Sequence, residues 1–229
     1  GGAANITTFD SSGFTITTTR GTGAVGGDVL IKTSGALTLG DVVATGGTAS
    51  AAGQNAGVVD VNAGTTLTTA NITAKGSDGA TGTDNGGAGG AVTLTGGTKV
   101  VLGGNIDTSA GANGTPGTGG TVTVASALEL NGNRTITTGV TAGNIVFNGT
   151  VDGDAGQAFN RTLGLTSGTG NIDFNGLVGN TVQLGTVTIN QAATVDVDAN
   201  FKAAGLSANN GGGAANITTF DSSGFTITT

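Results

Sequence analysis

The sequence predicts an all-β fold, a parallel β-solenoid with about eight three-strand coils in each 211-residue repeat. Three observations lead to this prediction. An eighteen-residue stretch occurs twice without a change, a shorter pattern of alternating apolar and polar residues recurs between the two copies, and the composition disfavours helices. The chain has 47 glycines, one proline and many Thr and Val residues, which suit short strands joined by turns.

The identical stretch reads GGAANITTFDSSGFTITT and occupies Gly1–Thr18 and again Gly212–Thr229, so the period is 211 residues. We interpret residues 1–211 as one complete β-solenoid repeat unit and residues 212–229 as the start of the next unit of a tandem array. The apolar residues of the two copies should form the repeat junction and occupy equivalent positions: Phe9, Phe14 and Ile16 in the first copy, and Phe220, Phe225 and Ile227 in the second.

The alternating pattern has Gly or Asn just ahead of its alternating residues and occurs seven times along the unit; its second and third occurrences span Ala56–Val61 and Gly89–Leu94. Its apolar pairs are expected to point inward as the stacking core, with the residue between them facing solvent. These pairs are Val29/Ile31, Val59/Val61, Val92/Leu94, Val122/Val124, Ile145/Phe147, Ile172/Phe174 and Val187/Ile189. The spacings between pairs are 30, 33, 30, 23, 27 and 15 residues, and we interpret the last as half a turn. The eight phenylalanines are expected to fill the core.

Two further short strands follow in the early coils, near Leu37–Leu39 and Val42–Val43 in the first of them. The longest loops come after the third strand of a coil, at Thr45–Gly57, Lys75–Gly90 and Ser109–Gly120. Insertions at a single corner should stack into a ridge along one edge of a solenoid. Because all three loops occur at the same place in the coil, we do not interpret them as flexible linkers.

Asparagine precedes isoleucine at five positions: Asn5, Asn71, Asn105, Asn144 and Asn171. Stacked asparagines can form amide ladders along a solenoid, and asparagine also tolerates turn geometry without any partner. Both interpretations are open at this stage.

Composition also limits the partners. Charged residues make up 9% of the chain and the net charge is −7, which disfavours nucleic acid and anionic lipid as partners. No apolar run approaches the ~20 residues that a membrane span requires. The chain has no Cys, which excludes a disulfide framework and suits a secreted bacterial protein. High glycine content is also found in disordered chains, but few charges and regular apolar positions favour a packed core.

The phrase GGxGG-VxL…GxI and the stretch NIDFNGLVGNTVQLGTVTI at Asn171–Ile189 resemble the giant repetitive exoproteins of bacteria, of the filamentous-haemagglutinin-like and beta strand repeat type. The resemblance lies in rhythm and composition over most of the unit. It implies a right-handed parallel β-helix, export across the outer membrane, and a role in adhesion or extracellular matrix at the bacterial surface.

Catalytic chemistry is sparse in this sequence. There is no His, and the seven Lys and Arg residues are scattered. Asp152 and Asp154 are the nearest approach to a site, because paired carboxylates can perform the acid–base chemistry of a hydrolase or bind Ca²⁺. Asp196 and Asp198 flank Val197 and are expected to face water. We therefore predict no enzymatic activity and no cofactor, with Ca²⁺ as the one candidate ion.

The leading hypothesis is a structural repeat that forms the shaft of an extracellular bacterial filament, with the next unit as its end-to-end partner. The alternative is an adhesin stalk or matrix protein that binds a cell or surface ligand through its glycine-rich loops. A third hypothesis is an ice-binding face, suggested by three Thr-x-Thr pairs: Thr93/Thr95, Thr121/Thr123 and Thr186/Thr188.

Overall fold

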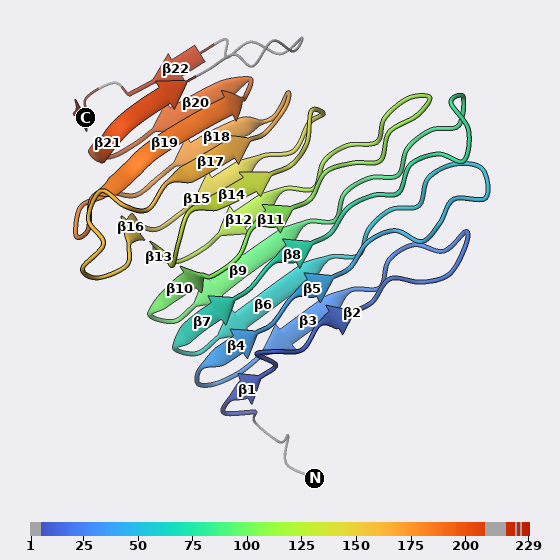
Figure 1. Cartoon of the computed structure of the whole chain (residues 1–229), viewed down its shortest axis with the longest axis horizontal. Helices are drawn as coiled ribbons and strands as arrows, with labels where there is room; N and C mark the ends of the chain where they lie inside the picture. The colour runs from blue at the N-terminus through green and yellow to red at the C-terminus, as the bar shows by residue number, and fades with distance from the viewer. Residues whose placement is uncertain (1–5, 209–218, 223, 225) are drawn as a thin grey trace.

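The computed structural model describes residues 6–208, 219–222, 224 and 226–229. In these residues the chain forms short β-strands joined by turns and loops. The strands stack in sequence order into three parallel sheets, so the fold is a parallel β-solenoid (Figure 1). The described residues contain no helix that is long and apolar enough to cross a membrane.

Each coil contributes one strand to sheet C, then one to sheet A, then one to sheet B. Sheet A contains β1 (Phe9–Asp10), β4 (Leu37–Leu39), β7 (Thr66–Thr69), β10 (Lys99–Leu102), β13 (Leu128–Leu130) and β16 (Val151–Gly153). Sheet C contains β3 (Val29–Lys32), β6 (Val59–Ala63), β9 (Val92–Gly96), β12 (Val122–Val124), β15 (Ile145–Phe147), β18 (Asn171–Phe174), β20 (Thr194–Val197) and β22 (Thr219–Asp221).

Sheet B contains β2 (Ile16–Thr17), β5 (Val42–Val43), β8 (Ile72–Thr73), β11 (Ile106–Asp107), β14 (Arg134–Thr137), β17 (Leu163–Thr166), β19 (Leu184–Gln191) and the later part of β21 (Phe201–Ala208). Sheet A continues past β16 through single bridges from Val151 to Val178 and from Val178 to Phe201. Phe201, the first residue of β21, then pairs with Ile227 of β23 (Ile227–Thr228). The long strand β21 therefore turns from sheet A into sheet B.

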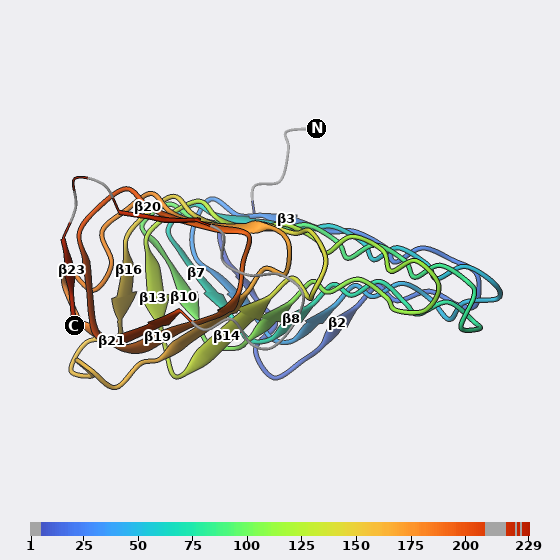
Figure 2. The ribbon, with the colours of Figure 1, turned by 90° about the horizontal axis from the view of Figure 1, so that it is seen from above.

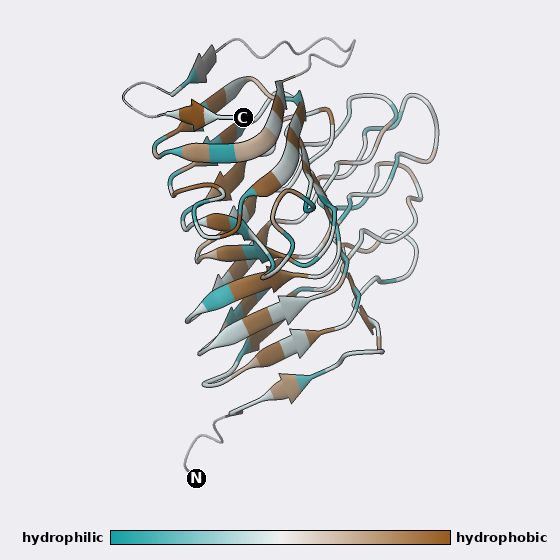
Figure 3. Cartoon of the chain, turned by 60° about the vertical axis from the view of Figure 1, so that its left-hand side comes forward, coloured by the Kyte–Doolittle hydropathy of each residue, from teal (hydrophilic) through white to brown (hydrophobic). Residues whose placement is uncertain are grey.

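Sheet C carries six of the seven predicted apolar pairs in one register, as two parallel columns. The first column passes through Val29, Val59, Val92, Val122, Ile145, Ile172 and Val195, and the second through Ile31, Val61, Leu94, Val124, Phe147, Phe174 and Val197. All of these side chains are buried except Ile31, which is half-buried. Figure 3 shows the resulting alternation of hydrophobic and hydrophilic residues along the strands. Stacked apolar columns of this kind are the main source of solenoid stability.

Two strands of sheet C are longer than the sequence pattern predicts. The pattern stops at Val61 and Leu94, which are fully buried and paired with each other, but β6 and β9 continue for two more residues. They end at Ala63 and Gly96, which are also buried and in register. The predicted pairs of these two coils point inward, and a third inward residue follows each pair. Small residues that are typical of turns form this third column, so the apolar pattern did not reveal it.

The seventh pair, Val187/Ile189, is buried as predicted, but its alignment with the other six pairs is wrong because it does not belong to sheet C. It lies on β19 of sheet B and pairs with Leu163 and Leu165. The cause is the preceding corner, which crosses sheet A with only the single bridge at Val178 and reaches sheet B early. The strand that continues sheet C is β20, and the interval of 15 residues covers two of the three faces rather than half a turn.

Among the described residues, aromatic rings stack in the C-terminal half of the core. The rings of Phe147 and Phe174 lie parallel with their centroids 5.0 Å apart, and Phe201 meets Phe174 edge-on at 5.5 Å. The expectation that every phenylalanine fills the core is wrong for Phe14 and Phe159, which are 76% and 56% exposed on turns.

Candidate functional site

Four successive coils extend outward at the corner between sheets B and C, and Figure 2 shows the extensions stacked into one flat projection. We call this projection the arm and define it as residues 19–26, 45–56, 75–89 and 109–119. The three long loops predicted to lie together are part of it. Backbone hydrogen bonds join neighbouring loops, for example from Gly46 N–H to the carbonyl of Lys75 (2.9 Å) and from Gly76 N–H to that of Ser109 (3.0 Å).

The arm differs from the sheets in the spacing of its hydrogen bonds. On the returning side of a loop, every third backbone N–H donates to the next coil. Gly53, Ala56 and Val59 donate to Asn85, Ala88 and Ala91, and Gly86, Gly89 and Val92 donate to Thr115, Thr118 and Thr121. A polyproline II helix has three residues per turn and no internal hydrogen bonds. The arm is therefore a small bundle of polyproline II-like segments.

Glycine permits these segments to meet backbone to backbone. At many arm or arm-base positions an added Cβ atom would overlap with a carbonyl oxygen of a neighbouring segment, among them Gly46, Gly53, Gly57, Gly76, Gly86, Gly87, Gly90, Gly111, Gly117 and Gly120. Gly82 at the arm tip is different, because a Cβ there would meet no atom within 4 Å. The arm is thus stabilised by backbone hydrogen bonds and close backbone packing, with little apolar burial.

At the corner between sheets B and C, two small residues of each coil come together where the chain leaves sheet B and enters sheet C. We call each such pair the neck. The outgoing members are Thr18, Ala44, Ala74, Thr108, Thr138 and Ser167, and the returning members are Gly27, Gly57, Gly90, Gly120, Gly143 and Gly170. The N–H of Gly57 donates to the carbonyl of Ala44 at 2.8 Å. Where the outgoing residue has a hydroxyl, it also donates to the glycine carbonyl, at 2.6 Å from Thr108.

The neck glycines were not predicted from the sequence, although a regular spacing marks them. Every neck glycine stands two residues before the first inward residue of a sheet C strand, as Gly90 does before Val92. Its role depends on the preceding coil, since Gly120 packs on the carbonyl of Gly90 and Gly90 on that of Gly57. A glycine of this kind marks a close backbone approach.

Asparagine side chains join successive coils at several corners. The backbone N–H of Asn105 donates to Oδ1 of Asn71 (2.9 Å), and that of Thr135 donates to Oδ1 of Asn105 (2.9 Å). At another corner the N–H of Asn171 donates to Oδ1 of Asn144 (2.9 Å). Four of the five Asn-Ile positions are therefore ladder residues, joined by bonds between amide oxygens and backbone N–H groups of the next coil. Asn5 lies outside the described residues.

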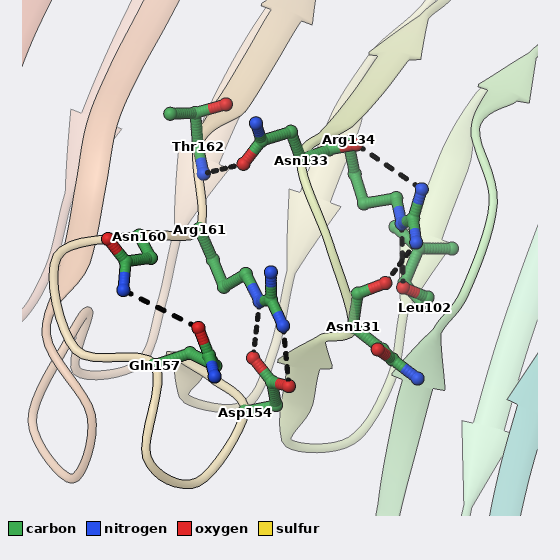
Figure 4. Close-up of polar contacts among 9 residues, drawn as sticks. All are labelled: Leu102, Asn131, Asn133, Arg134, Asp154, Gln157, Asn160, Arg161 and Thr162. Atoms are coloured by element: carbon green, nitrogen blue, oxygen red, sulfur yellow. Dashed lines mark hydrogen bonds and ion pairs between the residues drawn. The ribbon is translucent and has the colours of Figure 1, made fainter.

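The two calcium candidates are both held by hydrogen-bond donors. Asp152 Oδ1 accepts from the N–H of Thr181 (2.8 Å) and of Val182 (3.2 Å). Asp154 forms a two-bond ion pair with Arg161, with 2.8 Å between Nη2 and Oδ2 (Figure 4). The hydrogen bond from Arg161 lowers the pKa of Asp154 below its ordinary value. Within the described ranges no group of three or more His, Cys, Asp or Glu residues gathers as potential metal ligands.

A second arginine beside this pair binds backbone carbonyls. Arg134 Nε donates to Leu102 at 3.1 Å and Nη1 to Asn133 at 3.3 Å (Figure 4). Burial, and secondarily the charge of Arg161, lowers the pKa of Arg134, which nevertheless stays protonated at neutral pH because the pKa of arginine is normally above 12. Both arginines therefore hold corners of the solenoid together.

The threonine pairs do not form one continuous row. Thr93 and Thr123 are neighbours on the outer face of sheet C, where Asp60 and Val146 flank them. The pair Thr186/Thr188 lies on β19 of sheet B, a different face. Regular rows on one flat face are what the ice-binding hypothesis requires, and the observed arrangement offers only a two-coil patch.

Acidic residues succeed one another on the outer face at the C-terminal end of sheet C. Asp173 pairs in register with Asp196, and Asp196 with Asp221. Burial, together with the charges of Asp196 and Asp198, raises the pKa of Asp173. Asp196 and Asp198 are exposed on either side of buried Val197, as the alternation predicts.

The repeat junction differs from the expectation. In the first copy Phe9 pairs with Leu37 in sheet A, and Ile16 pairs with Val42 in sheet B. In the second copy Phe220 pairs with Val195 in sheet C, and Ile227 pairs with Phe201 in sheet A. The two copies are therefore not equivalent, because each strand of the second copy lies one face earlier in the coil. Phe14 is on an exposed turn, and Phe225 lies outside the described residues.

Comparison with protein-family models, curated proteins and solved structures gives no match for this chain.

Proposed function

We propose that the chain is a structural unit of a bacterial surface or extracellular filament, whose shaft is built from solenoid coils of successive units. One observation carries the proposal: the start of a second copy continues the stack of the first. Strands β22 and β23 belong to the repeated eighteen residues, and they pair in parallel with β20 and β21 of the preceding unit. The start of a further unit thus adds one strand to sheet C and one to sheet A, in the same parallel stack.

The sheets themselves favour growth along the stack. Each ends in an edge strand, with β1, β2 and β3 at one end and β21, β22 and β23 at the other. An edge strand presents unpaired backbone groups and is a template for further pairing. A coil of the next unit satisfies these groups and continues the apolar columns. The shaft is therefore a non-enzymatic, mechanical element in this proposal, and its partner is another copy of the same unit.

The length of a tandem protein tests the proposal. Coils stack about 4.8 Å apart, so a unit of nearly eight coils should add about 37 Å to a rod. We expect the maximum dimension from small-angle X-ray scattering to rise linearly by that amount between chains of one, two and three units. Growth with roughly the square root of unit number, as for beads on flexible linkers, would refute a continuous shaft.

The arm supports an adhesin as the second candidate. It projects from the shaft and carries small polar residues at its exposed tip, among them Thr81, Thr83 and Asn113. Alanine substitution of Thr81 and Thr83 leaves the left-handed backbone at Asn113 and the glycine packing in place, and it should abolish binding of bacteria to their surface ligand. Matched alanine substitutions of Thr38 and Thr68 on the outer face of sheet A are the control. Unchanged adhesion in the tip variant would exclude the arm tip as the binding surface.

A further inference from the structure

Two identical sequences occupy different faces of this solenoid. The strands of the first copy, β1 and β2, lie on sheets A and B, whereas those of the second copy, β22 and β23, lie on sheets C and A. A repeat that contained a whole number of coils would return each residue to its starting face. The repeat here does not.

The length of the unit can be counted in coils. From β1, sheet A is crossed seven more times, at β4, β7, β10, β13, β16, Val178 and β21. The chain then passes along sheet B in β21 and reaches sheet C at β22, where Phe220 repeats Phe9. The unit therefore contains seven full coils and two further faces, one face short of eight coils.

The inward sides of the three sheets are chemically similar. A second unit can therefore begin on a different sheet from the first. The inward columns of the sheets consist mainly of Val, Ile and Leu, as at Val42 in sheet B, Leu67 in sheet A and Val92 in sheet C, all fully buried. The second copy meets this same chemistry: Phe220 pairs with Val195 and Ile227 with Phe201. A unit rotated by one face thus places apolar positions in register with the apolar columns of the unit before it.

We infer that each unit of the array is rotated by one face relative to the unit before it, so that successive arms leave the shaft from successive edges. The arm of the first unit leaves between sheets B and C. In the second unit the strand that precedes the arm, Ile227–Thr228, lies on sheet A, so its arm leaves between sheets A and B. Three units complete the cycle, and the arms surround the filament instead of forming one ridge. This inference rests on the proposed array.

Cysteine pairs in the 229-residue chain test the rotation directly, because the sequence contains no Cys. The observed register places Asp196 opposite Asp221 and Lys202 opposite Thr228. An unrotated second copy would instead place Phe220 opposite Phe201, and hence Asp221 opposite Lys202. Registered residues on adjacent strands lie about 4.8 Å apart, within the range that a disulfide spans.

We expect D196C/D221C and K202C/T228C to form intramolecular disulfides under mild oxidation, identified by mass spectrometry of the linked peptides. The matched pair K202C/D221C should stay reduced under the same conditions. Efficient oxidation of K202C/D221C with failure of D196C/D221C would overturn the rotation. This measurement uses a single chain, so its result does not depend on whether filaments form.

Electron microscopy of a two-unit chain provides a second readout that needs no substitution. Class averages should show two arms that leave the rod from different edges, one third of a turn apart. Two arms on the same edge would overturn the inference while leaving the continuous shaft intact. A flexible chain of separate particles would instead refute the proposed shaft, even if the cysteine pairs behave as expected.

Discussion

The first four coils and the later coils of this solenoid close the same corner in two different ways. The early coils extend into the arm, where glycine backbones pack on one another and side chains contribute little. The later corners, near Gly143 and Gly170, are short, and the core beside them contains the stack of Phe147, Phe174 and Phe201. Backbone packing stabilises the first region and side-chain burial the second, so the two regions should respond to different substitutions.

The largest effect is expected in the aromatic stack. Phe174 contacts both neighbouring rings and is 1% exposed. Replacing it with alanine leaves a cavity, and Phe174→Ala should lower the free energy of unfolding by about 3–5 kcal/mol in urea denaturation. Phe14→Ala is the control, because Phe14 is exposed and its truncation should change stability by less than about 0.5 kcal/mol. Equal losses in the two variants would mean that the stack does not stabilise the later coils.

A smaller but more localised effect is expected at the neck of the arm. A methyl group on Gly90 would overlap with the carbonyl oxygen of Gly57, so the backbone must move to accommodate it. Gly90→Ala should cost about 1–3 kcal/mol, the range for overpacking, and should speed hydrogen exchange of arm amides. The matched variant Gly82→Ala adds the same methyl group in open space. If both alanines were tolerated equally, backbone packing would not be what stabilises the arm.

A stabilising substitution is available in the early coils. Thr69 is buried in the sheet A column between Leu39 and Leu102, and its hydroxyl is the buried side-chain atom without a hydrogen-bond partner among the described residues. Thr69→Val retains the shape and removes the unpaired hydroxyl, so the unfolding free energy should rise by about 1 kcal/mol. Thr68→Val, on the outward-facing neighbour, should not produce this gain. A loss at position 69 would mean that the hydroxyl is satisfied.

The smallest effect concerns Asp173 and depends on pH. Burial and two neighbouring aspartates raise the pKa of Asp173, so the folded chain binds a proton more tightly there than the unfolded chain. The resulting destabilisation is complete above the folded pKa and absent below the unfolded value of about 3.9. Asp173→Asn should therefore raise the melting temperature at pH 7, and the gain should disappear near pH 3. Asp60→Asn, in the same outward row, is the control, and a gain that persists at pH 3 would contradict the charge argument.

Much of this fold is readable from the sequence because it depends on local alternation. The strands Val29–Lys32 and Val59–Ala63 and the three long loops follow from period-two apolar residues and clustered glycines, which each coil repeats. The pattern located these strands but not their ends, since β6 and β9 continue past Val61 and Leu94 through small residues that also suit turns. The all-β class and the parallel stacking can be predicted because each coil repeats the same local pattern. The identical copies at the two ends likewise show, from the sequence alone, that a unit recurs.

Only the tertiary structure decided on which face each strand lies. Val187/Ile189 and the second copy carry the same alternation as the other strands, yet they lie on other sheets. For Val187/Ile189 the cause is the preceding corner, which crosses sheet A with the single bridge at Val178. Three equivalent apolar faces accept the same sequence, so pattern cannot distinguish them. The pairing of Asp154 with Arg161 and the closure of each neck by a residue up to sixteen positions away depend in the same way on how the chain turns between strands.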